Sequence, residues 1–236
     1  MNSFQFKQFT INQDRCAMKV GTDGVLLGAW ATISHRPFSI LDIGAGTGLI
    51  ALMMAQKSDA QLIDAIEIDE DAYEQCVENF ETSTWGDRLF CYHAGLDEFV
   101  EEIDDKYDLI ISNPPFYSED TQSGDKQRDI ARSNLSLPFE ELLQSVSTLL
   151  SNEGKFNVII PFKEQEKFIT MASNFNLFPN RITQVKGSLT SEIKRSLLEF
   201  SFNEKSYTTS LLIIEKERHQ YTDDYINLTK DFYLKM

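Results

Sequence analysis

One stretch constrains this chain more than any other, because it passes from an apolar run through three alternating glycines into a second apolar run. Residues 40–43 have the composition of a buried strand, Gly44, Gly46 and Gly48 follow, and residues 49–55 are apolar and helix-forming. Glycine is needed where the backbone adopts a positive φ or lies against a ligand. A helix that starts there points unpaired N–H groups at whatever binds. The stretch therefore predicts a strand, a tight turn and a helix that cradle a nucleotide.

Strand and helix patterns alternate along most of the chain after residue 38. Repeated β-α units are typical of a doubly wound α/β fold with a mostly parallel sheet. The last strands have no helices between them, which indicates an antiparallel edge. We expect residues 1–236 to form a single domain with its core at 39–236. Predicted strands cover residues 39–43, 61–67, 89–93, 107–112, 155–160, 181–186, 196–202 and 210–214, and predicted helices cover 48–56, 70–80, 96–103, 139–150, 163–175 and 222–233.

The first 38 residues form a short β/α extension ahead of this core. The alternating pattern over residues 4–11 predicts a strand. Thr22 or Asp23 is placed to cap a helix over residues 24–31. Packing on the core explains these elements, but it does not explain the polar cluster at residues 19–23.

The spacing of the glycines decides which nucleotide the turn suits. The dinucleotide fingerprint G-x-G-x-x-G would need a third glycine where this chain has Leu49. The chain instead has Asp42 two residues ahead of Gly44, Gly46 and Gly48. This spacing resembles the first motif of the class I S-adenosylmethionine-dependent methyltransferases, in which the carboxylate helps to hold the methionine end of the cofactor. The resemblance implies a Rossmann-like, seven-stranded sheet and a role in cofactor binding for Asp42 and the three glycines.

Two further residues lie at predicted strand ends, where ligands bind in such sheets. Glu67 ends the second strand, 19 residues after Gly48, and a carboxylate there can accept both ribose hydroxyls of a nucleoside. The alternative is that Glu67 is one more acid in an acidic region, and Asp69 is then the next candidate. Ala94 follows the third strand, where the adenine of the cofactor would lie, unless this is an ordinary βα turn.

Asn113, Pro114, Pro115 and Phe116 follow the fourth predicted strand. Alone they are a turn signal. Behind the glycine turn they resemble the N-P-P-[YF] methyltransferases, which methylate planar exocyclic or amide nitrogens of adenine, guanine or glutamine. The Asn113 side-chain oxygen and the Pro114 carbonyl would favour a transition state in which that nitrogen gains positive character. Phe116 offers a face on which a flipped-out base can stack.

Four blocks of the sequence narrow the resemblance from the N-P-P-[YF] methyltransferases in general to one family. They cover residues 16–30, 41–48, 112–116 and 129–132. Together they are similar to the bacterial tRNA1(Val) adenine-37 N6-methyltransferase family, over nearly the whole chain. The most discriminating part is Ala-Met-Lys-Val-Gly-Thr-Asp-Gly at residues 17–24.

This family resemblance implies methylation of the adenine just 3′ of the anticodon, with S-adenosylmethionine as the cofactor and tRNA as the partner. It also implies that Lys19, Gly21, Thr22 and Asn113 contribute to the cofactor site. Phe116 stands where many relatives have tyrosine, so stacking is kept and the hydroxyl is lost.

The net charge of −15 argues at face value against a nucleic-acid substrate, but the excess is confined to one window. Between Asp59 and Asp105 there are 16 acids and a single base, Arg88. A neutral or basic face elsewhere can still meet RNA. Long loops in compact domains are often functional, although a solvated loop and surface cations are the alternatives. The substrate-binding candidates are Lys126, Arg128 and Arg132 in a long loop over residues 117–137, and Lys194 and Arg195 near the C-terminal strands.

The remaining sequence features argue against a membrane protein, a secreted protein and a metalloprotein. No apolar run is long enough to span a membrane, and the start of the chain lacks a signal pattern. The three cysteines and three histidines are scattered, which predicts reduced thiols, a cytoplasmic protein and no metal site. We expect a monomer. A protein-glutamine N5-methyltransferase and an adenine N6-methyltransferase of ribosomal RNA or DNA stay open as alternatives.

Overall fold

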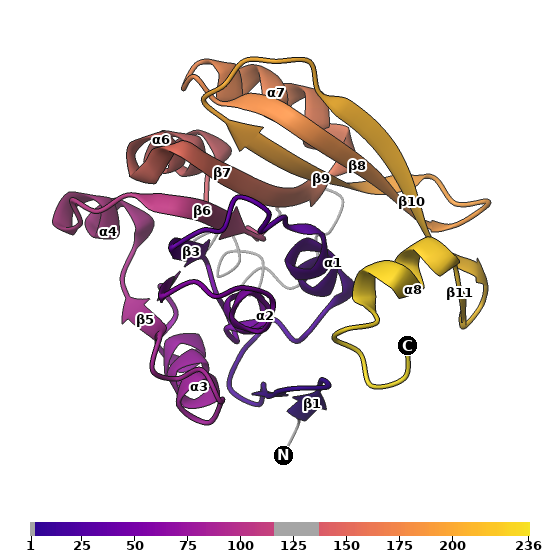
Figure 1. Ribbon diagram of the computed structural model, residues 1–236, viewed down its shortest axis with the longest axis horizontal. Coiled ribbons are helices and arrows are strands. Elements are labelled where there is room, and N and C mark those ends of the chain that lie inside the picture. Colours follow the sequence, from indigo (N-terminus) through magenta and orange to yellow (C-terminus); the bar gives the residue numbers. More distant parts are fainter. Residues whose placement is uncertain (1–2, 116–136) are drawn as a thin grey trace, which may run out of the picture.

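The computed structural model of the chain describes residues 3–115 and 137–236. Its centre is a nine-stranded sheet in the order β11-β10-β8-β9-β7-β6-β3-β4-β5, with helices on both faces (Figure 1). The strands of this sheet are β3 (Ser39–Ile43), β4 (Leu62–Glu67), β5 (Leu89–His93), β6 (Tyr107–Ser112), β7 (Leu150–Pro161), β8 (Phe178–Ser188), β9 (Ile193–Ser201), β10 (Thr208–Glu217) and β11 (Gln220–Tyr221).

Strand direction follows the expected doubly wound pattern. From β5 through β4, β3 and β6 to β7, neighbouring strands pair in parallel. Strand β9 lies between β7 and β8 and is antiparallel to both. The seven strands from β5 to β8 form the mostly parallel α/β sheet that the sequence predicts. At the C-terminal end β10 runs parallel to β8 and β11 antiparallel to β10, and these two extend the sheet to nine strands.

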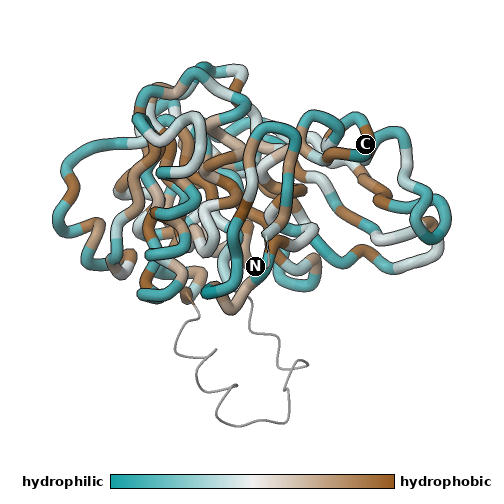
Figure 2. The backbone as a smooth tube through the Cα atoms, turned by 90° about the horizontal axis from the view of Figure 1, so that it is seen from below, coloured by the Kyte–Doolittle hydropathy of each residue, from teal (hydrophilic) through white to brown (hydrophobic). Residues whose placement is uncertain are grey.

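Two apolar cores lie on the two faces of the sheet. Residues of β3 alternate between them, because successive side chains of a strand point to opposite faces: Ile40 belongs to one core, and Leu41 and Ile43 to the other. Figure 2 shows hydrophobic segments concentrated in the middle of the molecule. The first core is covered by α1 (Thr22–Trp30), α2 (Leu49–Lys57), α3 (Glu70–Glu81) and α8 (Asp223–Thr229), and the second by α4 (Leu96–Glu102), α6 (Phe139–Leu149) and α7 (Gln165–Ser173).

The N-terminal segment differs from the prediction of one strand over residues 4–11. It forms a hairpin of two three-residue strands, β1 (Ser3–Gln5) and β2 (Thr10–Asn12), and the Phe6 N–H donates to the Phe9 carbonyl at 2.9 Å in the turn. The rings of Phe6 and Phe9 stack at 4.7 Å, and both are buried in the first core. Burial of both rings on one side requires the chain to reverse between them, which a continuous strand does not do.

Helix α1 also begins differently from the expectation. Its N-cap is Gly21, in extended conformation and without a side-chain cap, rather than Thr22 or Asp23. The Asp23 carboxylate instead accepts from the Arg195 Nε at 2.8 Å and connects α1 to β9. At the other end of α1, the Lys57 ammonium donates to three backbone carbonyls, those of Gly28, Ala29 and Ala31, at 2.6–3.1 Å. Both ends of α1 are therefore fixed by side chains from other elements.

No helix in the described part of the chain is long and apolar enough to cross a membrane.

Candidate active site

The glycine turn between β3 and α2 is left-handed at all three glycines. Gly44, Gly46 and Gly48 have φ values of 73°, 55° and 77°, a region that only glycine enters without strain. A Cβ at Gly44 or Gly46 would meet no atom within 4 Å, whereas one at Gly48 would lie 2.5 Å from the Phe80 ring and 2.8 Å from the Cys76 sulfur. Gly44 and Gly46 therefore face open space, and Gly48 permits close packing against α3.

Asp42 lies behind this turn. The side chain is 1% exposed, and its Oδ2 accepts from the Ala51 N–H in the first turn of α2 at 3.1 Å. Its Oδ1 has no hydrogen-bond partner among the described residues. Burial raises the pKa of Asp42 to about 7, and the nearby Glu67 carboxylate adds to this. Asp42 thus supports the start of α2, and it does not line the cavity described below.

Glu67 connects the ends of two strands. One carboxylate oxygen accepts from the Gly46 N–H at 2.7 Å, and the other accepts from the Asp69 N–H at 3.0 Å. The carboxylate therefore lies directly against the glycine turn. Asp69, the second ribose candidate, instead caps α3, because its Oδ1 accepts from the Ala72 N–H at 2.9 Å.

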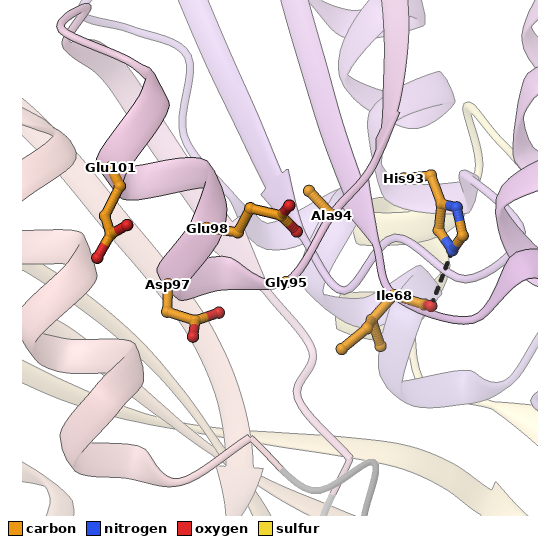
Figure 3. Close-up of a pocket in the computed structure, with 7 residues that line it drawn as sticks. All are labelled: Ile68, His93, Ala94, Gly95, Asp97, Glu98 and Glu101. Atoms are coloured by element: carbon orange, nitrogen blue, oxygen red, sulfur yellow. Dashed lines mark hydrogen bonds between the residues drawn. The ribbon is translucent and has the colours of Figure 1, made fainter.

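A cavity of about 530 Å³ lies beyond Glu67, at the carboxyl end of β5 (Figure 3). The His93 ring is held at its rim, because Nε2 donates to the Ile68 carbonyl at 3.1 Å and the ring stacks on Tyr73 at 5.2 Å. Ala94 lies in the turn as predicted. The sequence prediction did not single out Asp97, because it stands among many acids that carry no site signal. Its carboxylate lies close to Gly95, where an added Cβ would be 2.8 Å from the Asp97 Oδ1. The lining consists of Ile68, His93, Ala94, Gly95, Asp97, Glu98 and Glu101.

The main cavity, of about 1020 Å³, brings together five segments that are distant in the sequence. They are residues 18–24 before and in α1, the glycine turn, residues 113–115 after β6, the residues after β7, and the start of β9. It therefore includes the following residues that the sequence singles out: Lys19, Gly21, Thr22, Gly44, Gly46, Asn113, Pro114, Pro115, Lys194 and Arg195. Gly48, Glu67 and Ala94 are not part of its lining, like Asp42.

Asn113 and Pro114 stand where β6 leaves the sheet. The hydroxyl of Ser112 donates to the Ile43 carbonyl at 3.0 Å, which fixes the end of β6 to the end of β3. Pro114 is buried, and Asn113 is half-buried with its amide nitrogen beside Gly24 of α1. The turn at Asn113 and Pro114 thus starts beside the end of β3, where the glycine turn begins, and it approaches α1 at Gly24.

The segment before α1 is held by Gln13, a buried side chain. The Gln13 side-chain oxygen accepts from the Val20 N–H at 2.7 Å, and its carbonyl accepts from the Lys19 ammonium. This contact holds Lys19 at the cavity.

Four predicted residues, Phe116, Lys126, Arg128 and Arg132, lie outside the described residues. The structure also identifies cavity residues that the sequence prediction missed, Phe162 and Lys163. No motif marks them, because they reach the site only through the strand order of the sheet.

Comparison with known proteins gives one consistent family. The family model of the methyltransferase small domain matches residues 25–177. A tRNA1(Val) (adenine(37)-N6)-methyltransferase from Flavobacterium johnsoniae is 64% identical, with 99% of this chain and 100% of the relative covered. The protein of the same name from Flavobacterium psychrophilum is 63% identical, over 99% and 100%.

Among solved structures, a predicted O-methyltransferase from Agrobacterium tumefaciens is similar, with a TM-score of 0.68 over 89% of this chain and 96% of that protein. Its sequence identity of 18% supports the fold alone.

Proposed function

The chain belongs to the methyltransferase small domain family and, within it, to the tRNA1(Val) (adenine(37)-N6)-methyltransferases, and on this premise we propose that it methylates N6 of adenine 37 in tRNA1(Val). The observation that carries the proposal is that the glycine turn and the Asn113-Pro114 turn line the same cavity. A donor held at the first turn and an amine held at the second would meet in that cavity. A tRNA substrate would place the enzyme in the cytoplasm.

The residues fit S-adenosylmethionine, which when bound supplies an electrophilic sulfonium methyl group. The space over Gly44 and Gly46 leaves room for a ligand against the backbone. The start of α1, with uncapped backbone N–H groups beside Gly21 and Thr22 and with Lys19 nearby, suits a carboxylate.

Further along the same edge, Glu67 suits ribose hydroxyls, since each carboxylate oxygen has a second lone pair to share. The apolar Ile68 and Ala94 and the acceptor Asp97 suit an adenine ring with its amino group.

The residues after β6 then act on the substrate amine. The Asn113 side-chain oxygen and the Pro114 carbonyl accept from the two N–H groups of adenine N6, which favours the charge that develops on nitrogen during transfer. Consecutive prolines restrict the backbone that presents these acceptors. No general base is needed beforehand, because the methylated nitrogen loses its proton to water afterwards. For Phe116, which lies outside the described residues, the proposal rests on the sequence alone: its ring would stack on the base.

The test uses labelled S-adenosylmethionine and two transcripts of tRNA1(Val), one unmodified and one with guanine at position 37. We expect N6-methyladenosine at position 37 of the first transcript and no label in the second. Equal labelling of both transcripts would refute the position. Labelling of a release factor, ribosomal RNA or DNA in place of tRNA would refute the substrate and favour the glutamine, ribosomal RNA or DNA alternatives, because the same acceptors serve all of them.

A further inference from the structure

The main cavity has a wall that no motif accounts for, and the register of the sheet explains how it forms. Ser112 of β6 pairs in parallel with Val158 of β7. Strand β6 ends at Ser112, whereas β7 continues for three more residues to Pro161, and both Pro161 and residues 113–115 line the main cavity. The chain leaving β7 thus emerges beside the turn that presents Asn113.

The start of β9 also lines the main cavity, because β9 is the neighbour of β7 on the side opposite β6. Pro161, the last residue of β7, pairs antiparallel with Arg195 of β9. Lys194 therefore lies next to the residues that follow Pro161, which form the short η2 helix (Phe162–Glu164). We name Phe162, Lys163 and Lys194 the β7–β9 rim, and all three line the main cavity.

Phe162 brings an aromatic ring to the cavity. It is the one aromatic side chain among the described residues that line the cavity, and it is half-buried at the end of a strand. An adenine that flips out of the RNA loses the bases stacked on its two faces. An aromatic side chain can stack on one of these faces in place of a base, whatever the neighbouring nucleotides are. Phe162 lines the same cavity as Asn113 and Pro115, which suits such contact with the target adenine.

The cavity lining has more cationic than acidic side chains, whereas the chain as a whole carries a net charge of −15. Four cationic side chains line the cavity, Lys19 and Arg195 together with Lys163 and Lys194 of the rim, against two acids. One of the acids, Asp23, is paired with Arg195 at 2.8 Å. The acidic window at residues 59–105 forms β4, α3, β5 and α4, at the other end of the sheet from β8–β11 (Figure 1). A protein of net charge −15 therefore concentrates positive charge at the cavity where an RNA would enter.

We propose that the β7–β9 rim holds the substrate nucleotide: Phe162 covers one face of the target adenine, and Lys163 and Lys194 bind RNA phosphates beside it. This inference rests on the proposed function, because it takes the occupant of the cavity to be an adenine within RNA. It makes Phe162 a substrate-positioning residue and gives the two lysines a part in affinity rather than in chemistry.

The first experiment measures methylation of tRNA1(Val) by Phe162→Ala, Phe162→Leu and Phe162→Trp. Loss of stacking in the alanine and leucine variants lowers kcat/KM for tRNA about tenfold or more, and tryptophan restores most of it. The affinity for S-adenosylmethionine, measured without tRNA, stays unchanged. A leucine variant within twofold of the parent protein would overturn the assignment of Phe162, and so would a parallel loss of cofactor affinity, which would assign the ring to the cofactor.

The second experiment measures tRNA affinity as a function of salt for the double variant Lys163→Gln/Lys194→Gln. Each phosphate contact contributes about 0.7 to 0.9 to the slope of log affinity against log salt, so the slope becomes shallower by about 1.5. The matched control is Lys205→Gln/Lys235→Gln, since both of these lysines are exposed and outside the cavity lining. Lys205 follows β9 at the amino edge of the parallel strands.

Equal slopes for the two double variants would overturn the phosphate contacts. The parent protein separates this inference from the proposed function: if it fails to methylate tRNA, the function itself is refuted, and if it methylates tRNA while the variants behave like their controls, the rim alone is refuted.

Discussion

Alanine at Gly48 should mainly lower stability, whereas alanine at Gly44 should mainly weaken cofactor binding. Both positions have a positive φ, which costs an alanine about 1–2 kcal/mol. At Gly48 the new methyl would also lie 2.5 Å from the Phe80 ring and 2.8 Å from the Cys76 sulfur. Overpacking of this kind adds about 1–3 kcal/mol. Gly48→Ala should therefore lower the free energy of unfolding by about 2–5 kcal/mol in total.

Gly44→Ala should cost only the backbone strain, because no atom lies within 4 Å of its new methyl. That methyl instead enters the space over the turn, so the variant should bind S-adenosylmethionine at least tenfold more weakly, a loss of about 1.4 kcal/mol or more. Urea denaturation and calorimetric titration of both variants test the pair. Equal losses of stability would refute the packing role of Gly48, and full cofactor affinity in Gly44→Ala would refute the cradle.

Two further predictions concern buried ionisable groups. The pKa of Asp42 rises to about 7 in the folded protein from its ordinary value of 3.8, so the stability that protonated Asp42 contributes is complete below about pH 4 and is lost as the pH rises through 7. The free energy of unfolding of the parent protein should therefore fall by up to about 4 kcal/mol between those pH values, and this fall should be absent in Asp42→Asn. Urea denaturation at a series of pH values measures it. Parallel pH profiles of the parent and the variant would contradict the prediction. Lys57→Met should lower the free energy of unfolding by about 2 kcal/mol, because three carbonyls at the end of α1 lose a charged donor. An unchanged urea midpoint would show that water replaces the ammonium without cost.

Much of the fold and part of the site could be predicted because their signals are local. The alternation of β and α units predicted the parallel strands. The residues that follow the strand ends indicated the carboxyl edge of the sheet, where Asn113 and Gly44 line the same cavity. The hairpin at the N-terminus was missed because residues 6–9 contain no glycine, proline or asparagine to mark a turn.

Other features depend on contacts that no local pattern contains. In the sequence motif Gly48 cannot be told apart from Gly44 and Gly46. Only the structure shows that a Cβ at Gly48 would meet Phe80 of α3, so that Gly48 serves packing rather than ligand binding. Phe162 and Lys194 are separated by a helix and a strand in the sequence. They meet because β9 inserts between β7 and β8, which periodicity does not determine.

The most direct test of the central claim is a single-turnover measurement on Asn113→Ala, with tRNA1(Val) and S-adenosylmethionine both saturating. If the Asn113 oxygen stabilises the charge on the amine, the rate of N6-methyladenosine formation should fall at least about 10²-fold, as for loss of one transition-state hydrogen bond. Cofactor affinity should change far less than the rate. A variant that forms N6-methyladenosine at a tenth of the parent rate or faster would contradict the account.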